Sequence, residues 1–195
     1  MAFIGMRHVV AATLSSHTDG ADPTYGTGMV VGMAIQGNVT INRNNNPLYA
    51  DDTIAEEDNS ITSMEVEVGV DDLTEAAEAY LLGTKAVEGT GTNPPVTYID
   101  TDDSAPAVGF GYIRVRRKNG TTTYQSVWYY KAVFGMTSEN SQTKGESIEW
   151  QTPTLTARCA GISVDDSGAK SFRKRQSFST EAAAMDWLDD LAGIS

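Results

Sequence analysis

Alternation of apolar and polar residues along the chain predicts mainly β-strands. In the clearest case, Ile61–Val70, every second residue from Met64 onward is apolar, and Glu65 and Glu67 lie between them. Such alternation is typical of a strand with one face in a core and the other in water. Further strands are expected at residues 6–14, at 29–42 and within 146–162.

Residues 107–134 are predicted to form a β-hairpin that turns at Asn119 and Gly120. An Asn-Gly pair favours a two-residue type I′ turn, because both residues of that turn need positive φ. A turn of this length fixes the register and therefore the face of every side chain. One face carries Ile113, Val115, Tyr124 and Trp128, which we expect on the core side, and the other carries Arg114, Arg116, Thr123 and Gln125. We expect Gly109 and Gly111 to leave room for Trp128.

Two segments have the apolar spacing of helices. In residues 72–82, Asp72 lies three positions before Glu75, as in a capping box, and Gly83 follows as a natural terminator. In residues 180–192, after Ser179 or Thr180 as the cap, an apolar stripe is formed by Ala184, Trp187, Leu188 and Leu191.

The fold class expected from these elements is α+β, mostly β, with a β-sandwich or barrel at its centre. That domain should span residues 1–164, with one flanking helix at 72–82. Residues 165–195 should form a C-terminal extension that carries the helix at 180–192. Two long loops are expected, an acidic connector at 43–60 and a second loop at 84–106, and loops of this length are either functional or mobile.

Charge is distributed unevenly along the chain. The 195 residues carry a net charge of −12, and residues 51–103 hold 15 acidic residues against one basic residue, Lys85. The remainder holds 11 acidic and 13 basic residues. Binding to a nucleic-acid backbone needs clustered Lys and Arg, so conventional DNA binding is excluded. The acidic third is either a solvated surface or a surface that docks on the basic part of a neighbouring copy.

The remaining composition sets further limits. Cys159 is the sole cysteine, so no disulfide can form within the chain. The sequence contains no run of 18 apolar residues, so neither a membrane span nor a membrane anchor is predicted. The first residues lack the basic and apolar regions of a signal peptide, and we expect folding in a cytoplasm.

Candidate chemistry is sparse, and no cofactor is expected. Ser15, Ser16, His8, His17 and Asp19 could be assembled as a nucleophile set, but their nearness in sequence alone does not indicate the required geometry. Asp100, Asp102 and Asp103 could bind calcium, although the glycine and distal glutamate of an EF-hand loop are absent. Arg114, Arg116, Arg117 and Lys118, interleaved with aromatic residues, could stack on single-stranded nucleic acid, although a solvated hairpin tip explains them more simply. The prediction is therefore that the chain is not an enzyme.

The chain resembles the major tail (tail tube) proteins of long, flexible-tailed bacteriophages. The segments that carry the resemblance, in chain order, are 6–14, 35–41 (IQGNVTI), the acidic connector, 63–69 (SMEVEVG) leading into 71–83, 107–116 (AVGFGYIRVR), 129–134 (YYKAVF), 154–158 (TLTAR) and 178–188 (FSTEAAAMDWL). Together they cover most of the chain, and their order and spacing carry the resemblance more than any one of them.

This resemblance implies a structural virion subunit that assembles in the host cytoplasm. Copies of the chain would form rings, commonly hexamers, and the rings would stack into a hollow tail that conducts the genome. The partners implied are other copies, a tape-measure protein, and tail terminator and initiator proteins. DNA would pass without specific binding, because such channels are commonly acidic.

Two sets of residues are the candidates for these roles. Glu65 and Glu67 are the candidates for the lumen, because they lie on the polar face of the alternating strand. In this family long loops and terminal arms commonly join the rings, so the inter-ring candidates are Arg43, Asn45, Asp51, Asp52, Glu56, Glu57, Arg173, Arg175, Trp187, Asp189 and Asp190. We also expect the basic segment 170–175, in the same chain or the next copy, to offset Asp186, Asp189 and Asp190 at the C-terminal end of the last helix, where anions are disfavoured.

Two other classes of protein remain open. One is a different virion component, a tail terminator or a capsid decoration protein, which would not polymerise. The other is a carbohydrate-binding β-sandwich that uses Trp128 or Trp150 as an exposed stacking platform.

Overall fold

The computed structural model describes residues 2–50, 53–87, 89–90, 94, 96–138 and 152–194. Within these residues the fold is mostly β, with a large antiparallel sheet and two helices, as the alternation predicted. The strands of the main sheet are Ala2–Ser16 (β1), Thr24–Tyr25 (β2), Met29–Gly32 (β3), Ala34–Arg43 (β4), Ile61–Val70 (β7), Ala107–Lys118 (β10), Thr121–Ser138 (β11), Thr154–Cys159 (β12) and Arg173–Phe178 (β15). They follow the order β2–β1–β10–β11–β12–β7–β4, while β15 pairs with β11 and β3 with β1.

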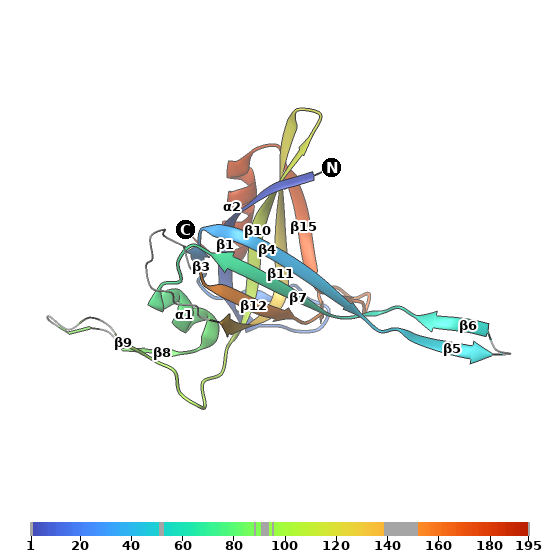
Figure 1. Ribbon diagram of the computed structural model, residues 1–195, viewed down its shortest axis with the longest axis horizontal. Helices are drawn as coiled ribbons and strands as arrows, with labels where there is room; N and C mark the ends of the chain where they lie inside the picture. Colours follow the sequence, from blue (N-terminus) through green and yellow to red (C-terminus); the bar gives the residue numbers. More distant parts are fainter. Residues whose placement is uncertain are drawn as a thin grey trace, which may run out of the picture.

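Strand β11 connects the two layers of the fold. Its first half pairs with β15 and its second half with β12, so the sheet divides along this strand. Strands β12, β7 and β4 then cross in front of β10 and β11 (Figure 1). The resulting arrangement is a sandwich, and the side chains between its layers form the main core.

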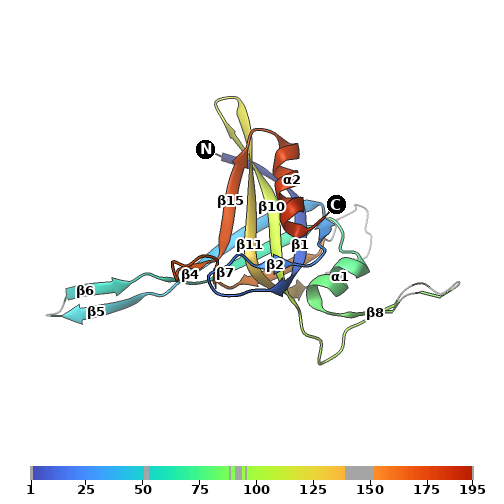
Figure 2. The ribbon, with the colours of Figure 1, turned by 180° about the vertical axis from the view of Figure 1, so that it is seen from behind.

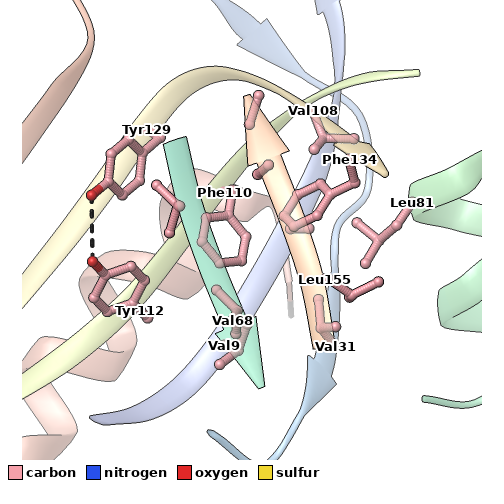
Figure 3. Close-up of a cluster of buried hydrophobic side chains, with 14 of the residues drawn as sticks. Val9, Val31, Val68, Leu81, Val108, Phe110, Tyr112, Tyr129, Phe134 and Leu155 are labelled. Carbon is pink, nitrogen blue, oxygen red and sulfur yellow. Dashed lines mark hydrogen bonds between the residues drawn. The ribbon is translucent and has the colours of Figure 1, made fainter. Parts of the chain in front are cut away.

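The main core is an apolar cluster centred on Phe110 (Figure 3). The ring of Phe110 contacts that of Phe134 edge to face, with centroids 5.0 Å apart. Val68 and Leu155 close the cluster from the second layer, and each is almost fully buried. At one border of the cluster the hydroxyl groups of Tyr112 and Tyr129 lie 3.3 Å apart. Leu81 of helix α1 (Glu75–Leu82) packs at another border.

A second core lies on the opposite side of β10 and β11, under helix α2 (Glu181–Ala192; Figure 2). Trp128 is its largest member, and Trp128 and Leu188 are both fully buried. The Ser126 hydroxyl donates a hydrogen bond of 2.8 Å to the Ala184 carbonyl and fixes the helix on the sheet. Residues 165–195, expected as an extension, therefore contribute β15 to the sheet and α2 to this core.

The hairpin formed by β10 and β11 turns as predicted. Asn119 has φ 49° and Gly120 has φ 81°, and Lys118 pairs with Thr121. The expectation of a single core face was wrong, however. The face with Ile113 and Trp128 packs under α2, but Tyr112 and Tyr129 on the other face fill the main core. Only the part of the hairpin next to its turn has one face toward a core and the other toward water.

Gly109 and Gly111 make room for Trp128, as predicted. A Cβ atom at Gly111 would lie 2.7 Å from the Trp128 ring and 2.7 Å from Leu188. A Cβ atom at Gly109 would collide with the rings of Trp128 and Tyr25. Both glycines are therefore required by packing rather than by backbone conformation.

Helix α1 begins three residues later than predicted. Its N-cap is Thr74, whose hydroxyl accepts a 3.2 Å hydrogen bond from the Ala77 N–H. The expected capping box at Asp72 and Glu75 does not form; Asp71 beside it accepts the N–H of Met33 at 2.8 Å and joins the helix approach to the β3–β4 junction. Gly83 ends the helix at φ 73°, as predicted.

The two predicted long loops contain hairpins. Strands Asn46–Ala50 (β5) and Thr53–Asp58 (β6) pair within the segment expected as an acidic connector. Strands Lys85–Val87 (β8) and Val96–Tyr98 (β9) pair within the second loop. A short pair, Ile162–Ser163 (β13) and Lys170–Ser171 (β14), precedes β15.

Candidate functional site

The β5–β6 hairpin projects well beyond the sandwich (Figures 1 and 2), and we refer to residues 46–58 as the arm. Its large apolar side chains face solvent: Leu48 is 61% exposed, Tyr49 65% and Ile54 57%. Tyr49 pairs with Ile54 across the two strands, so both side chains lie on one face. No described residue of the arm belongs to either core cluster.

The base of the arm is held by polar contacts. Arg43, at the end of β4, donates to the Asn59 carbonyl at 3.0 Å, and Asn44 donates to the Asp58 carboxylate at 2.8 Å. Hydrogen bonds from the Ser60 backbone and from Asn44 lower the pKa of Asp58. These contacts set the direction in which the arm leaves the body. The neighbouring Asn45 is exposed.

The arm also carries free negative charge. Glu56 and Glu57 are exposed and form no ion pair within the part of the chain that the structure describes. Asp51 and Asp52, the other inter-ring candidates of this segment, lie outside the described residues. The arm therefore combines an apolar pair with acidic neighbours.

A second projecting hairpin, β8–β9, lies on the other side of the body (Figure 1). It too exposes apolar side chains, with Val87 at 44%, Val96 at 47% and Tyr98 at 50%, followed by Ile99 at 72%. An isolated two-stranded hairpin is at best marginally stable in water. Projecting apolar hairpins are accordingly typical of surfaces that become covered when a partner binds.

Glu65 and Glu67 lie on a polar face of the second layer, as the alternation predicted. In the register of the sheet, Glu65 lies between Thr40 and Arg158. Glu67 lies between Asn38 and Thr156 in the same way. The face is thus hydrophilic on all three strands, and it is acidic along β7 with a basic residue on β12.

Some of the C-terminal inter-ring candidates make contacts inside the chain, and the others are exposed to solvent. Arg173 donates to the Tyr129 hydroxyl at 3.0 Å, and the half-buried Trp187 packs against Phe178 with ring centroids 6.2 Å apart. Arg175 and Asp190 are exposed. The structure therefore does not bring these residues and the arm together within one chain.

Within one chain, the partner of Asp189 is His8 and not the expected basic segment 170–175, and a contact with that segment of the next copy stays a prediction. The Asp189 carboxylate lies 2.7 Å from His8 Nε2 of β1, and no residue of the segment 170–175 forms an ion pair with it in the described structure. His8 adopts φ 51° at an irregularity of the β1–β10 pairing, which turns its side chain toward the helix. Arg7 pairs with Glu181 at 2.9 Å at the other end of α2. Strand β1 thus clamps the helix at both ends.

The candidate catalytic set is not assembled. His17 contacts the Ser163 carbonyl at 2.9 Å, while His8 is engaged with Asp189. No three His, Cys, Asp or Glu side chains among the described residues are arranged to hold a metal ion. At the calcium candidate, the Asp103 carboxylate instead accepts the Asp100 N–H at 2.8 Å within a turn.

The aromatic residues of the β10–β11 hairpin belong to the cores. Trp128 is fully buried, so it offers no platform for a sugar, and Trp150 lies outside the described residues. Burial raises the pKa of Tyr25 and Tyr112, and it raises that of the Cys159 thiol to about 12. No helix among the described residues is both long and apolar enough to cross a membrane.

Sequence reasoning missed the apolar residues of the arm. The signal was present, because Leu48, Tyr49 and Ile54 stand in an otherwise acidic and asparagine-rich segment.

Comparison with known protein families finds no matching family model, and comparison with curated proteins finds no match.

Proposed function

We propose that this chain is the tail tube subunit of a long, flexible-tailed bacteriophage. Copies would form rings, expected to be hexamers, and stacked rings would form the hollow conduit of the virion through which the genome leaves. The observation that carries the proposal is the arm, a projecting hairpin whose Tyr49–Ile54 pair is left exposed by the part of the chain that the structure describes. The sequence resemblance supplies the class of assembly.

The distribution of surfaces supports assembly of many copies. Contacts between two different patches of one chain generate closed rings or open filaments, whereas contacts between identical patches end at dimers. The chain has projecting apolar hairpins on opposite sides of the body (Figure 1).

We assign the lumen to the polar face that carries Glu65 and Glu67. A conduit for DNA must not bind phosphate strongly, and carboxylates at its wall repel the backbone. Replacing both residues with glutamine should slow DNA passage and leave assembly intact. Loss of assembly in that double variant would contradict this assignment.

The remaining partners follow from the resemblance. A tape-measure protein would occupy the lumen during assembly, and initiator and terminator proteins would bound the tube. A single-ring virion component, such as a terminator, stays the alternative. A carbohydrate-binding role has lost one of its two candidate platforms, because Trp128 is fully buried.

Negative-stain electron microscopy over a concentration series, with size-exclusion chromatography alongside, tests the proposal. Hollow tubes with a regular axial repeat are the expected result. Isolated rings that never stack would favour the terminator or decoration class. A monomer at every concentration would count against self-assembly and would bring glycan-binding assays forward.

A further inference from the structure

A further apolar patch is exposed where β1 begins. Phe3, in the first residues of β1, is 51% exposed, and the adjacent Ile4 is 57% exposed. Both lie beside the tip of the β10–β11 hairpin, where Phe3 pairs with Arg116. An exposed phenylalanine and isoleucine side by side are unusual for a strand that is fully buried from Val9 to Ala12.

Positive charge surrounds this apolar patch. The guanidinium carbon of Arg114 lies 4.4 Å from the centroid of the Phe3 ring. Arg117 and Lys118 follow on the exposed tip, and neither forms an ion pair with any carboxylate that the structure describes. We call Phe3, Ile4, Arg114, Arg116, Arg117 and Lys118 the tip patch.

The tip patch adjoins a surface cavity of about 440 Å³. Its walls include Phe3 and Arg114 together with Ile35 of β4 and Tyr112 of β10. Ile35 is itself 52% exposed. A cavity of this size and lining can take an aromatic or branched aliphatic side chain beside a cation.

The arm is the chemical complement of the tip patch. The arm has an exposed Tyr49–Ile54 pair with Glu56 and Glu57 beside it. The tip patch has exposed apolar residues next to arginine and lysine side chains. Opposite charges around an apolar centre favour association and fix its orientation. The arm and the hairpin tip point away from the body in different directions in both views (Figures 1 and 2). The two surfaces therefore cannot meet within one chain.

We infer that the arm of one copy docks on the tip patch of another copy, with the Tyr49–Ile54 pair against Phe3 and the adjoining cavity. The inference rests on the proposed function and specifies the surface that receives the arm. The contact joins two different patches, so each copy both gives an arm and receives one, and the contact can repeat without end.

Charge reversal tests this contact in solution. One variant carries Glu56→Lys and Glu57→Lys on the arm, and the other carries Arg117→Glu and Lys118→Glu on the tip. Each variant alone should raise the concentration needed for assembly at least about tenfold, because like charges would then face one another. An equimolar mixture should assemble again, since every arm then meets a tip of opposite charge. Sedimentation velocity and electron microscopy read out both results.

Matched controls separate this contact from net charge. Asp19→Lys with Asp22→Lys changes the net charge by the same amount as the arm variant, at exposed positions outside both surfaces, and should assemble like the wild type. Unaltered assembly of both reversal variants would overturn the inference and leave the tube proposal standing. Loss of assembly that mixing does not restore would also overturn it. A wild-type chain that never assembles would overturn the inference and the proposed function together.

Disulfide trapping gives an independent readout. A mixture of Ile54→Cys and Phe3→Cys copies should yield a cross-linked dimer on a non-reducing gel, and either variant alone should yield much less. The native Cys159 is 1% exposed and does not interfere. Equal cross-linking in the mixture and in the single variants would contradict the assigned pairing.

Discussion

The β10–β11 hairpin and the β5–β6 arm are the same kind of element with opposite surroundings. In the first, Trp128 on one face and Tyr129 on the other are fully buried. In the second, the Tyr49–Ile54 pair is mostly exposed in the isolated chain. Both hairpins carry large apolar side chains, but only the first has other parts of the chain packed on both of its faces.

This difference separates residues that hold the chain together from residues that are available to join chains. Burial in a core stabilises the monomer by removing apolar area from water. The apolar area of the arm makes no such contribution until a partner covers it. Substitutions in the two hairpins should therefore affect different measurements, namely monomer stability for one and assembly for the other.

The largest expected effect is that of Trp128→Ala. Removing the largest side chain of the core under α2 should lower the free energy of unfolding by about 3–5 kcal/mol. Urea denaturation of the monomer measures it, and Trp187→Ala, at a half-buried position, is the matched control with a smaller loss. A loss below about 1 kcal/mol would show that this core is not tightly packed.

The next largest effect is expected at alkaline pH, which should lower the free energy of unfolding of the monomer. Burial, with a smaller contribution from Tyr129, raises the pKa of Tyr112 above its ordinary value of 10.0. The unfolded chain then loses this proton first, so the contribution of this tyrosine to stability is constant below about pH 10 and falls above it by about 1.4 kcal/mol per pH unit. Tyr112→Phe should make the decline less steep, whereas Tyr49→Phe in the arm should not. Identical pH profiles for Tyr112→Phe and the wild type would contradict the prediction.

A smaller effect is expected at the clamp on α2. Asp189→Ala removes the partner of the part-buried His8 and should lower the free energy of unfolding by about 1 kcal/mol. Asp190→Ala, at the exposed neighbouring position, should change it by less than about 0.5 kcal/mol. Thermal unfolding of the two variants measures both changes in stability. Equal stabilities would show that the contact between Asp189 and His8 contributes nothing measurable.

The smallest effect on stability is expected in the arm. Tyr49→Ala with Ile54→Ala should change the free energy of unfolding of the monomer by less than about 0.5 kcal/mol, because neither side chain is buried. The same variant should lose assembly in the sedimentation experiment. A clear loss of monomer stability would mean that the arm packs on its own body in solution, and it would remove the contrast between the two hairpins.

Local patterns determined much of this fold. The Asn119–Gly120 turn fixed the register of the central hairpin, and the alternation in Ile61–Val70 gave the strand and its wet face correctly. The apolar stripe after Thr180 gave the last helix to within one residue. These features depend on turn conformation and on side-chain periodicity, both of which are set by a few neighbouring residues.

Only the tertiary structure decided which strand pairs are buried on both faces and which are not buried on either. The second face of the β10–β11 hairpin is covered because strands distant in sequence fold over it. Asp189 meets His8 for the same reason, across 181 positions. The arm shows the converse, because its sequence predicts an acidic connector, and only the structure shows a strand pair whose exposed apolar residues belong to neither core. Periodicity fixes the direction of a side chain, whereas long-range packing fixes what that side chain meets.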